Sequence, residues 1–518
     1  MLFGLAAAGT GAALAADLPP LPVQVSNAVA APPAAQTPIA TPPPAATDFN
    51  KPELPISLKD GLEKAFESNL DLSIDRISPL EAQANVLAAK GAFDPVFNAS
   101  YNHGVAGTPE FTNPPFVVND YDSASASINQ PITTGGTIGV TTSSTSTSNT
   151  GNDFVTEWDS FAGLTLSQPL LQNFGTDVSQ AAIRVAQRNQ SATEAGLEYE
   201  IDQIITNVAN AYYELVFARS NYQALKESVR LAEQLKSDNQ ARVEIGTMSP
   251  LDISTANAEV ASRRENLLSA ARLIENDENN LRLLITKDVT PLLKHRLVPV
   301  DLPPENWTPD PLQADIAGAL QARADLRQAR ELLAQNKLTE AYRKNQLLPT
   351  LGVTGAYGYE GLGYNATSSY QNVSGAHQPD WSVGVVLQIP IGNRSERGQY
   401  QAAQYETTRQ QLILRQLEQN VIVQTDNAEG QAETNRQQIT AARVARQLAE
   451  ESLRAEEEKL KAGVSTSYVV LQLQDNLRTA RITELRAIAD FQESVVELMR
   501  VEGRARSYFN IELRGAAY

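Results

Sequence analysis

The feature that most constrains this chain is an internal repeat, whose unit reads helix, alternating strands, long helix, turn and long helix. In the first copy, residues 69–72 lead into residues 93–97. In the second copy, residues 323–326 lead into residues 347–351 at the same separation, and a proline, Pro95 or Pro349, stands before the first strand residues of each copy. An internal repeat dictates the architecture. Long helices attached at mid-chain to short strands predict a helical tube joined to a β-barrel.

The helices carry the clearest periodicity. Two series of residues spaced seven apart mark a heptad seam: Ile201, Val208, Leu215, Tyr222 and Val229, and Ile204, Ala211, Ala218, Leu225 and Ala232. The pattern predicts one helix from about Thr176 to Ile245, roughly 105 Å long at 1.5 Å per residue. The second copy, from residue 395 to residue 462, is similar. We expect such a seam to need neighbouring helices that one chain lacks.

Capping and turn residues indicate where these helices begin and end. Ser57 is the predicted N-cap of a helical region that runs towards Ala92, with an interruption near Pro79. Gly246 suits the position after the first long helix, and Ser249 and Pro250 suit the start of the next. Gly463 marks the equivalent turn in the second copy. The returning helices are predicted over residues 251–286 and 468–502.

Between the helices the period changes to two. Residues 96–101, 124–129, 138–140 and 163–167 alternate in the first copy, and residues 353–359 and 383–387 in the second. One apolar face and one Ser/Thr/Asn face is the pattern of a lipid-facing barrel with a wet lumen, although a half-exposed soluble sheet gives it too. The first strand region is longer by one hairpin, which turns at residues 134–136. A polar loop is expected at residues 363–379.

The remaining segments complete the predicted domains. Residues 1–16 are apolar and end near a signal-peptidase motif, so they predict a signal peptide whose charged start is missing or lies upstream. Residues 17–54 are rich in Ala and Pro and predict a disordered leader. The first repeat is expected at 55–300, the second at 301–511 and a tail at 512–518. No later stretch reaches the roughly 18 consecutive apolar residues of a transmembrane helix.

Composition excludes several classes of function. The chain has no cysteine and a net charge of −18, which argues against disulfides, thiolate metal sites and nucleic acid as a partner. There is no Gly-rich phosphate loop, metal-ligand spacing or nucleophile–base pair. The sequence therefore predicts neither an enzyme nor a cofactor or metal site.

With these features the chain resembles the TolC family of outer-membrane efflux proteins over residues 55–511, most specifically at 242–257 and 459–475. The resemblance implies an α+β membrane protein, internally duplicated: a homotrimer with a transmembrane β-barrel in outer-membrane lipid, continued by a long periplasmic α-helical barrel. It implies the exit duct of a tripartite efflux or type I secretion system, partnered by a periplasmic adaptor and an inner-membrane pump.

The resemblance also implies site residues at the helical turns. The adaptor-docking turns would comprise Gly246, Thr247, Met248 and Ser249, and Gly463, Val464, Ser465 and Thr466. Family members carry acidic residues six and nine positions after the second turn glycine, at the periplasmic aperture. Val469 and Gln472 stand there in this chain, so Asp252 and Asp475 are the remaining acidic candidates. We expect an aperture that lacks the acidic ring.

One alternative architecture remains at this stage. A trimeric surface adhesin or scaffold can also combine a coiled-coil stalk with a barrel anchor. That design places its strands at the C-terminus, whereas here the strand patterns lie mid-chain in both copies.

Overall fold

The computed structural model describes residues 51–109, 116–149, 155–246, 248–301, 307 and 311–511, all within one compact unit, Ala46–Tyr518. The predicted signal peptide, the predicted tail and most of the predicted leader lie outside the described residues, as does Thr247. The first strand starts at Glu53, so the last two residues of the predicted leader belong to a strand.

Both halves of the described chain run from shorter helices through strands to a long helix and a returning helix, but the first half has two more strands of the main sheet. The first half contains β1 (Glu53–Ile56), α1 (Leu58–Ser68), α2 (Leu70–Asp75), α3 (Ile77–Lys90), β2 (Val96–Pro109), β3 (Phe116–Pro131), β4 (Thr137–Asn149), β5 (Glu157–Pro169), α4 (Thr176–Ser179), α5 (Ala181–Glu244), α6 (Pro250–Ile285) and β6 (Arg296–Pro299). The second contains α7 (Leu312–Ala322), α8 (Ala324–Asn345), β7 (Thr350–Gly363), α9 (Ala366–Ser374), β8 (Pro379–Gln388), α10 (Arg394–Lys461), α11 (Ser467–Val501) and α12 (Ala505–Tyr508).

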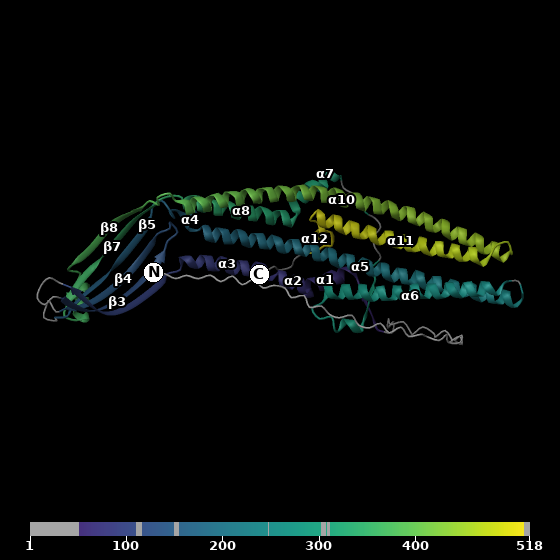
Figure 1. The fold of residues 1–518 in the computed structure, drawn as a ribbon, viewed down its shortest axis with the longest axis horizontal. Helices are drawn as coiled ribbons and strands as arrows, with labels where there is room; N and C mark the ends of the chain where they lie inside the picture. The colour runs from purple at the N-terminus through teal and green to yellow at the C-terminus, as the bar shows by residue number, and fades with distance from the viewer. Residues whose placement is uncertain are drawn as a thin grey trace, which may run out of the picture. The chain divides into compact units, whose positions relative to one another are not determined.

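Six strands form one antiparallel sheet in the order β2-β3-β4-β5-β7-β8. The expected extra hairpin is β3–β4, and it is inserted between β2 and β5. A separate parallel pair, β1 with β6, joins the beginning of the first repeat to its end. The long helices lead away from the six-stranded sheet, and the turns between α5 and α6 and between α10 and α11 lie at their far ends (Figure 1).

The two faces of the six-stranded sheet differ in chemistry. One row of paired residues crosses all six strands on the apolar face: Phe97, Ile128, Val140, Leu164, Tyr357 and Trp381. All six side chains are exposed, between 51% and 68%. The neighbouring row lies on the polar face: Asn98, Ser127, Thr141, Gly163, Gly358 and Asp380. The alternation predicted from the sequence is therefore continuous across the sheet.

The heptad seam of α5 is buried inside this one chain. Ile201, Val208 and Leu215 belong to a core that also contains Ile274 of α6 and Val496 of α11. The expectation that the seam needs other chains is wrong, because the second repeat and the short helices already cover it. Every helix in the described residues is too short or too polar to cross a lipid bilayer.

Capping explains where the helices begin, and it corrects two boundaries. Ser57 and Asp60 form the capping box of α1. The helical region breaks at Asn69, whose side chain accepts from Leu72 N at 2.8 Å, and again at Arg76, not at Pro79. Pro79 is the third residue of α3, where a backbone N–H has no partner within the helix. The predicted helix from Thr176 to Ile245 is divided at Gln180 into α4 and α5.

The expected loop at 363–379 contains α9. The Ser369 and Ser160 hydroxyl oxygens lie 2.6 Å apart, and those of Tyr370 and Thr142 lie 3.1 Å apart. Ser160 and Thr142 belong to the apolar face by register, so α9 covers part of that face. Gly361 permits the contact, because a Cβ there would lie 2.3 Å from the Ser369 carbonyl oxygen.

Candidate functional site at the helical turns

The first turn has the geometry that its sequence predicts. Gly246 adopts a φ of +79°, and its N–H donates to the Val243 carbonyl at 3.0 Å. This left-handed conformation favours glycine, which lacks a Cβ. The Ser249 hydroxyl accepts from Leu251 N at 3.2 Å, and Pro250 is the first residue of α6. The chain therefore reverses within a few residues.

The second turn ends α10 with a Schellman motif. Gly463 N donates to the Leu460 carbonyl at 3.2 Å, and Val464 N donates to the Lys459 carbonyl at 3.0 Å. The φ of Gly463 is +76°. The Ser465 hydroxyl donates to Glu456, and this bond, together with Lys459, lowers the pKa of the Glu456 carboxyl. A short network thus fixes the shape of the turn.

Apolar side chains flank both turns and face solvent. Ile245 and Val464 are each 75% exposed, Leu251 is 71% exposed and Tyr468 is 66% exposed. Of these four residues, only Val464 is among the docking residues predicted from the sequence. The signal for the others was an apolar residue beside the turn glycine or at the first turn of the returning helix. Clustered exposed apolar side chains of this kind are typical of protein interaction surfaces.

The structure brings the two turns together. The buried Ser467 hydroxyl donates to Asn239 Oδ1 at 2.7 Å and lies 3.9 Å from Met248 Sδ. Arg242 of α5 donates to the Leu460 carbonyl at 3.4 Å. Leu235 of α5 also packs in an apolar cluster with Leu460 and Val470 of the second repeat. The two hairpins are therefore in contact at their tips through polar and apolar groups.

The contact between the two hairpins contains polar atoms without partners among the described residues. Asn239 Nδ2 is buried and has no hydrogen bond. Further along, the buried Arg263 donates to Gln474 Oε1 at 3.2 Å and to the Ser228 carbonyl at 3.1 Å, but its Nη2 atom has no partner. Buried polar groups that are partly satisfied weaken a contact relative to an apolar one.

The predicted aperture residues are placed differently from one another. Val469 and Gln472 are exposed on the first turns of α11. Asp252 accepts from Ser249 N at 3.2 Å as the second member of the α6 capping box. Asp475 lies 2.6 Å from Arg478 of its own helix. Both acidic candidates therefore have local partners, and the assignment of all four to an aperture remains a prediction.

The sequence pattern of the outer membrane efflux protein family matches residues 61–286 and 316–504, and so it includes both turns. The chain belongs to this family. Family membership places it in the outer membrane, in the TolC group of efflux channels, and the members that it resembles are channels and not enzymes.

Relatives of known function are distant in sequence. The outer membrane protein TolC of Vibrio cholerae is 27% identical over 44% of this chain and 50% of its own length. The outer membrane efflux protein BepC of Brucella suis is 23% identical over 86% of this chain and 85% of its own length. The chain thus spans about half the length of this TolC. The match alone does not assign the activity of the whole TolC protein to this chain.

Solved structures of outer membrane efflux proteins share the fold. The CmeC channel of Campylobacter jejuni superposes with a TM-score of 0.64 at 18% identity, over 86% of each chain. The OprN channel superposes with a TM-score of 0.67 at 16% identity, over 86% of this chain and 89% of its own. Identities this low support the architecture alone.

Proposed function

We propose that three copies of this chain form the exit duct of a tripartite efflux or type I secretion system. Three sheets close a β-barrel in the outer membrane, and the helices continue it as an α-helical barrel through the periplasm. The turns at Gly246–Ser249 and Gly463–Thr466 dock a periplasmic adaptor, which links the duct to an inner-membrane pump.

The observation that carries this proposal is the two-faced sheet. On one face of the sheet, the six apolar side chains in the row from Phe97 to Trp381 are exposed. The polar row beside it offers Ser, Thr, Asn, Gly and Asp. Burying the apolar row in lipid is favourable, at about 25 cal/mol per Å² of apolar surface, and a water-filled lumen suits the polar row.

Assembly of several copies is supported by surfaces that are unpaired within the described residues. The strands β2 and β8 are the two edges of the sheet, and each has a strand neighbour on one side only. Along α10, Leu412, Val423 and Leu448 are 62%, 57% and 57% exposed. Unpaired edges and exposed apolar helix positions are the features that neighbouring copies cover in a closed assembly.

The number of copies is tested on detergent-extracted full-length protein by mass photometry. We expect trimers, and a stable monomer with full helicity would contradict the proposal.

Docking is tested by efflux of a fluorescent substrate in cells that lack their own exit duct and express the matching adaptor and pump. Val464→Asp should reduce efflux at least tenfold, because it puts a charge on the exposed apolar tip. Val464→Thr, which keeps the shape without the charge, is the matched control. Normal efflux with trimeric Val464→Asp protein would show that docking lies elsewhere.

A further inference from the structure

We propose that the hairpin β3–β4 is a pore-widening element: with it, the trimeric duct has an eighteen-stranded wall in the outer membrane. This inference rests on the proposed trimer. The resemblance to the family implies two strands per repeat, hence four per copy and twelve per trimer. Here one copy carries six strands in a single sheet. The diameter of a barrel grows roughly linearly with strand number, so the wall would be about 1.5-fold wider than with twelve strands.

The hairpin is part of the wall and not an appendage to it. β3 pairs with β2 along the whole of Val96–Pro109, and β4 pairs with β5 from Thr137 to Thr147. No direct pairing joins β2 to β5, because the hairpin separates them. Removing it from the wall would break two complete antiparallel ladders.

The hairpin also continues both faces of the sheet. Ile128 and Val140 fill the apolar row between Phe97 and Leu164, and they are 51% and 56% exposed like their neighbours. On the polar face, Ser127 and Thr141 lie between Asn98 and Gly163. A hairpin that projected into water would not need an apolar face in register with the apolar face of the neighbouring strands.

The turn of the hairpin is seated where the sheet meets the helices. Gly175 N donates to the Thr134 carbonyl at 3.0 Å, and the Thr134 hydroxyl donates to Gln168 Oε1 at 2.7 Å. The Ser179 hydroxyl, in α4, donates to the Thr133 carbonyl. Gly135, with a φ of +93°, lies so close to Asn173 that a Cβ would be 2.1 Å from its carbonyl oxygen.

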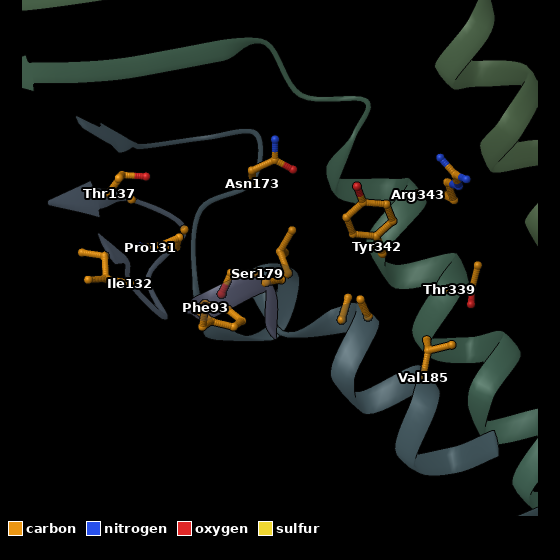
Figure 2. A pocket seen from close by; sticks show the side chains of 16 residues that line it. Phe93, Pro131, Ile132, Thr137, Asn173, Ser179, Val185, Thr339, Tyr342 and Arg343 are labelled. Atoms are coloured by element: carbon orange, nitrogen blue, oxygen red, sulfur yellow. The ribbon is translucent and has the colours of Figure 1, made fainter. Parts of the chain in front are cut away.

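The same turn forms one wall of an open pocket of about 490 Å³, and residues of α8 and the start of α5 line it on the other side. Figure 2 shows Ile132 and Thr137 at the strand ends on one side of the pocket, with Tyr342 and Val185 on the helices opposite. The turn of the hairpin therefore makes specific hydrogen bonds and packing contacts at the junction, as expected for an integral part of the fold.

The strand count allows this insertion without disturbing closure. With six alternating strands, β2 and β8 run in opposite directions, so β8 of one copy can pair antiparallel with β2 of the next. A hairpin adds two strands and keeps the number even. Three copies thus close eighteen strands in one antiparallel ladder, a size at which porins leave an aqueous channel.

The decisive experiment is electron cryomicroscopy of the full-length protein in lipid nanodiscs. Trimers with eighteen strands are expected. Trimers with twelve strands would overturn the inference and leave the proposed exit duct intact. Particles that are not trimeric would overturn the proposed duct and this inference with it.

Cysteine cross-linking in cells gives an independent test, because the chain has no cysteine of its own. The Ser100 and Ser125 hydroxyl oxygens are 2.8 Å apart across β2 and β3. The double variant Ser100→Cys, Ser125→Cys should therefore cross-link within one chain. The matched pair Ser100→Cys, Phe161→Cys lies at the same level of the sheet and would be neighbours only if β2 paired with β5, so it should not cross-link. The reverse pattern would show that the hairpin is excluded from the wall.

Discussion

Arg486 of α11 holds Glu214 of α5 through its Nη1 atom, which lies 2.8 Å from both carboxylate oxygens. This bidentate contact joins the second repeat to the first, midway along the helices. Asp490 lies 2.6 Å from the same guanidinium and Glu493 lies 3.4 Å from it. One cation therefore faces three carboxylates, with Asp277 of α6 nearby.

The excess of carboxylates predicts that mild acid stabilises the helical part. Burial and the Glu214 charge raise the pKa of Glu493 to about 7, and the same causes raise the pKa of Asp277 to about 6. In the unfolded chain these groups titrate near 4.5 and 3.8. Each group holds its proton more tightly in the folded state, so the free energy of unfolding falls as pH rises through about 4 to 7.

The measurement is the midpoint of thermal loss of helical circular dichroism in detergent. It should be a few degrees higher at about pH 5.5 than at about pH 7.5. Glu493→Gln should raise the midpoint at the higher pH and reduce the difference between the two. An unchanged pH dependence in this variant would exclude Glu493 as a cause.

Removal of the shared cation should have a larger effect. Arg486→Ala leaves Glu214, Asp490 and Glu493 without their partner and should lower the free energy of unfolding by about 1–3 kcal/mol, since the group is only partly buried. The matched control is Arg436→Ala, which breaks an exposed pair with Glu433 on α10. Exposed pairs contribute about 0–1 kcal/mol. Equal effects of the two substitutions, measured by chemical denaturation, would contradict the assigned role of Arg486.

The polar seam at the tips predicts a contact that opens. Because Ser467 and Asn239 are buried and hydrogen-bonded across the two hairpins, a disulfide between Asn239→Cys and Ser467→Cys should hold the tips together. Efflux should then be lost, and it should return when the disulfide is reduced. Each single cysteine variant, treated with the same oxidant, is the control. Full efflux with the disulfide in place would show that transport needs no separation at this point.

The aperture should bind cations weakly, because Asp252 is occupied in a capping box and Asp475 by Arg478. In planar bilayers, trivalent cations added on the side of the turns should block the wild-type channel only at high concentration. Val469→Asp with Gln472→Asp restores carboxylates at the family positions and should lower the blocking concentration at least tenfold. Tight block of the wild type would show that an acidic ring exists elsewhere at the tips.

Local chemistry made several elements predictable from the sequence. Helix caps and turns depend on hydrogen bonds between residues close in sequence, so they can be predicted from a single sequence. Examples are the caps at Ser57 and at Ser249 with Pro250, and the two turn glycines. α9 has a local signal of the same kind, since Asn365 and Ser368 form a capping box. Pro79 does not interrupt its helix, because a proline near the start of a helix removes no helical hydrogen bond.

Long-range relationships could not be predicted in the same way. The seam of α5 was expected to need other chains, whereas it packs on helices of its own chain that lie far away in sequence. The contact of Ser467 with Asn239 joins residues of different repeats, and no spacing in the sequence indicates it.

The even number of strands in the sheet has a consequence for descent. A hairpin returns the chain to the side from which it left, so its gain or loss leaves α4 and α5 pointing the same way. The β3–β4 turn contacts Gln168 and Asn173, which follow one another closely at the end of β5, so its contacts on this side are confined to one short segment. The six-stranded sheet and the helical hairpins can therefore change separately over evolutionary time, and a lineage can alter one without re-adapting the other.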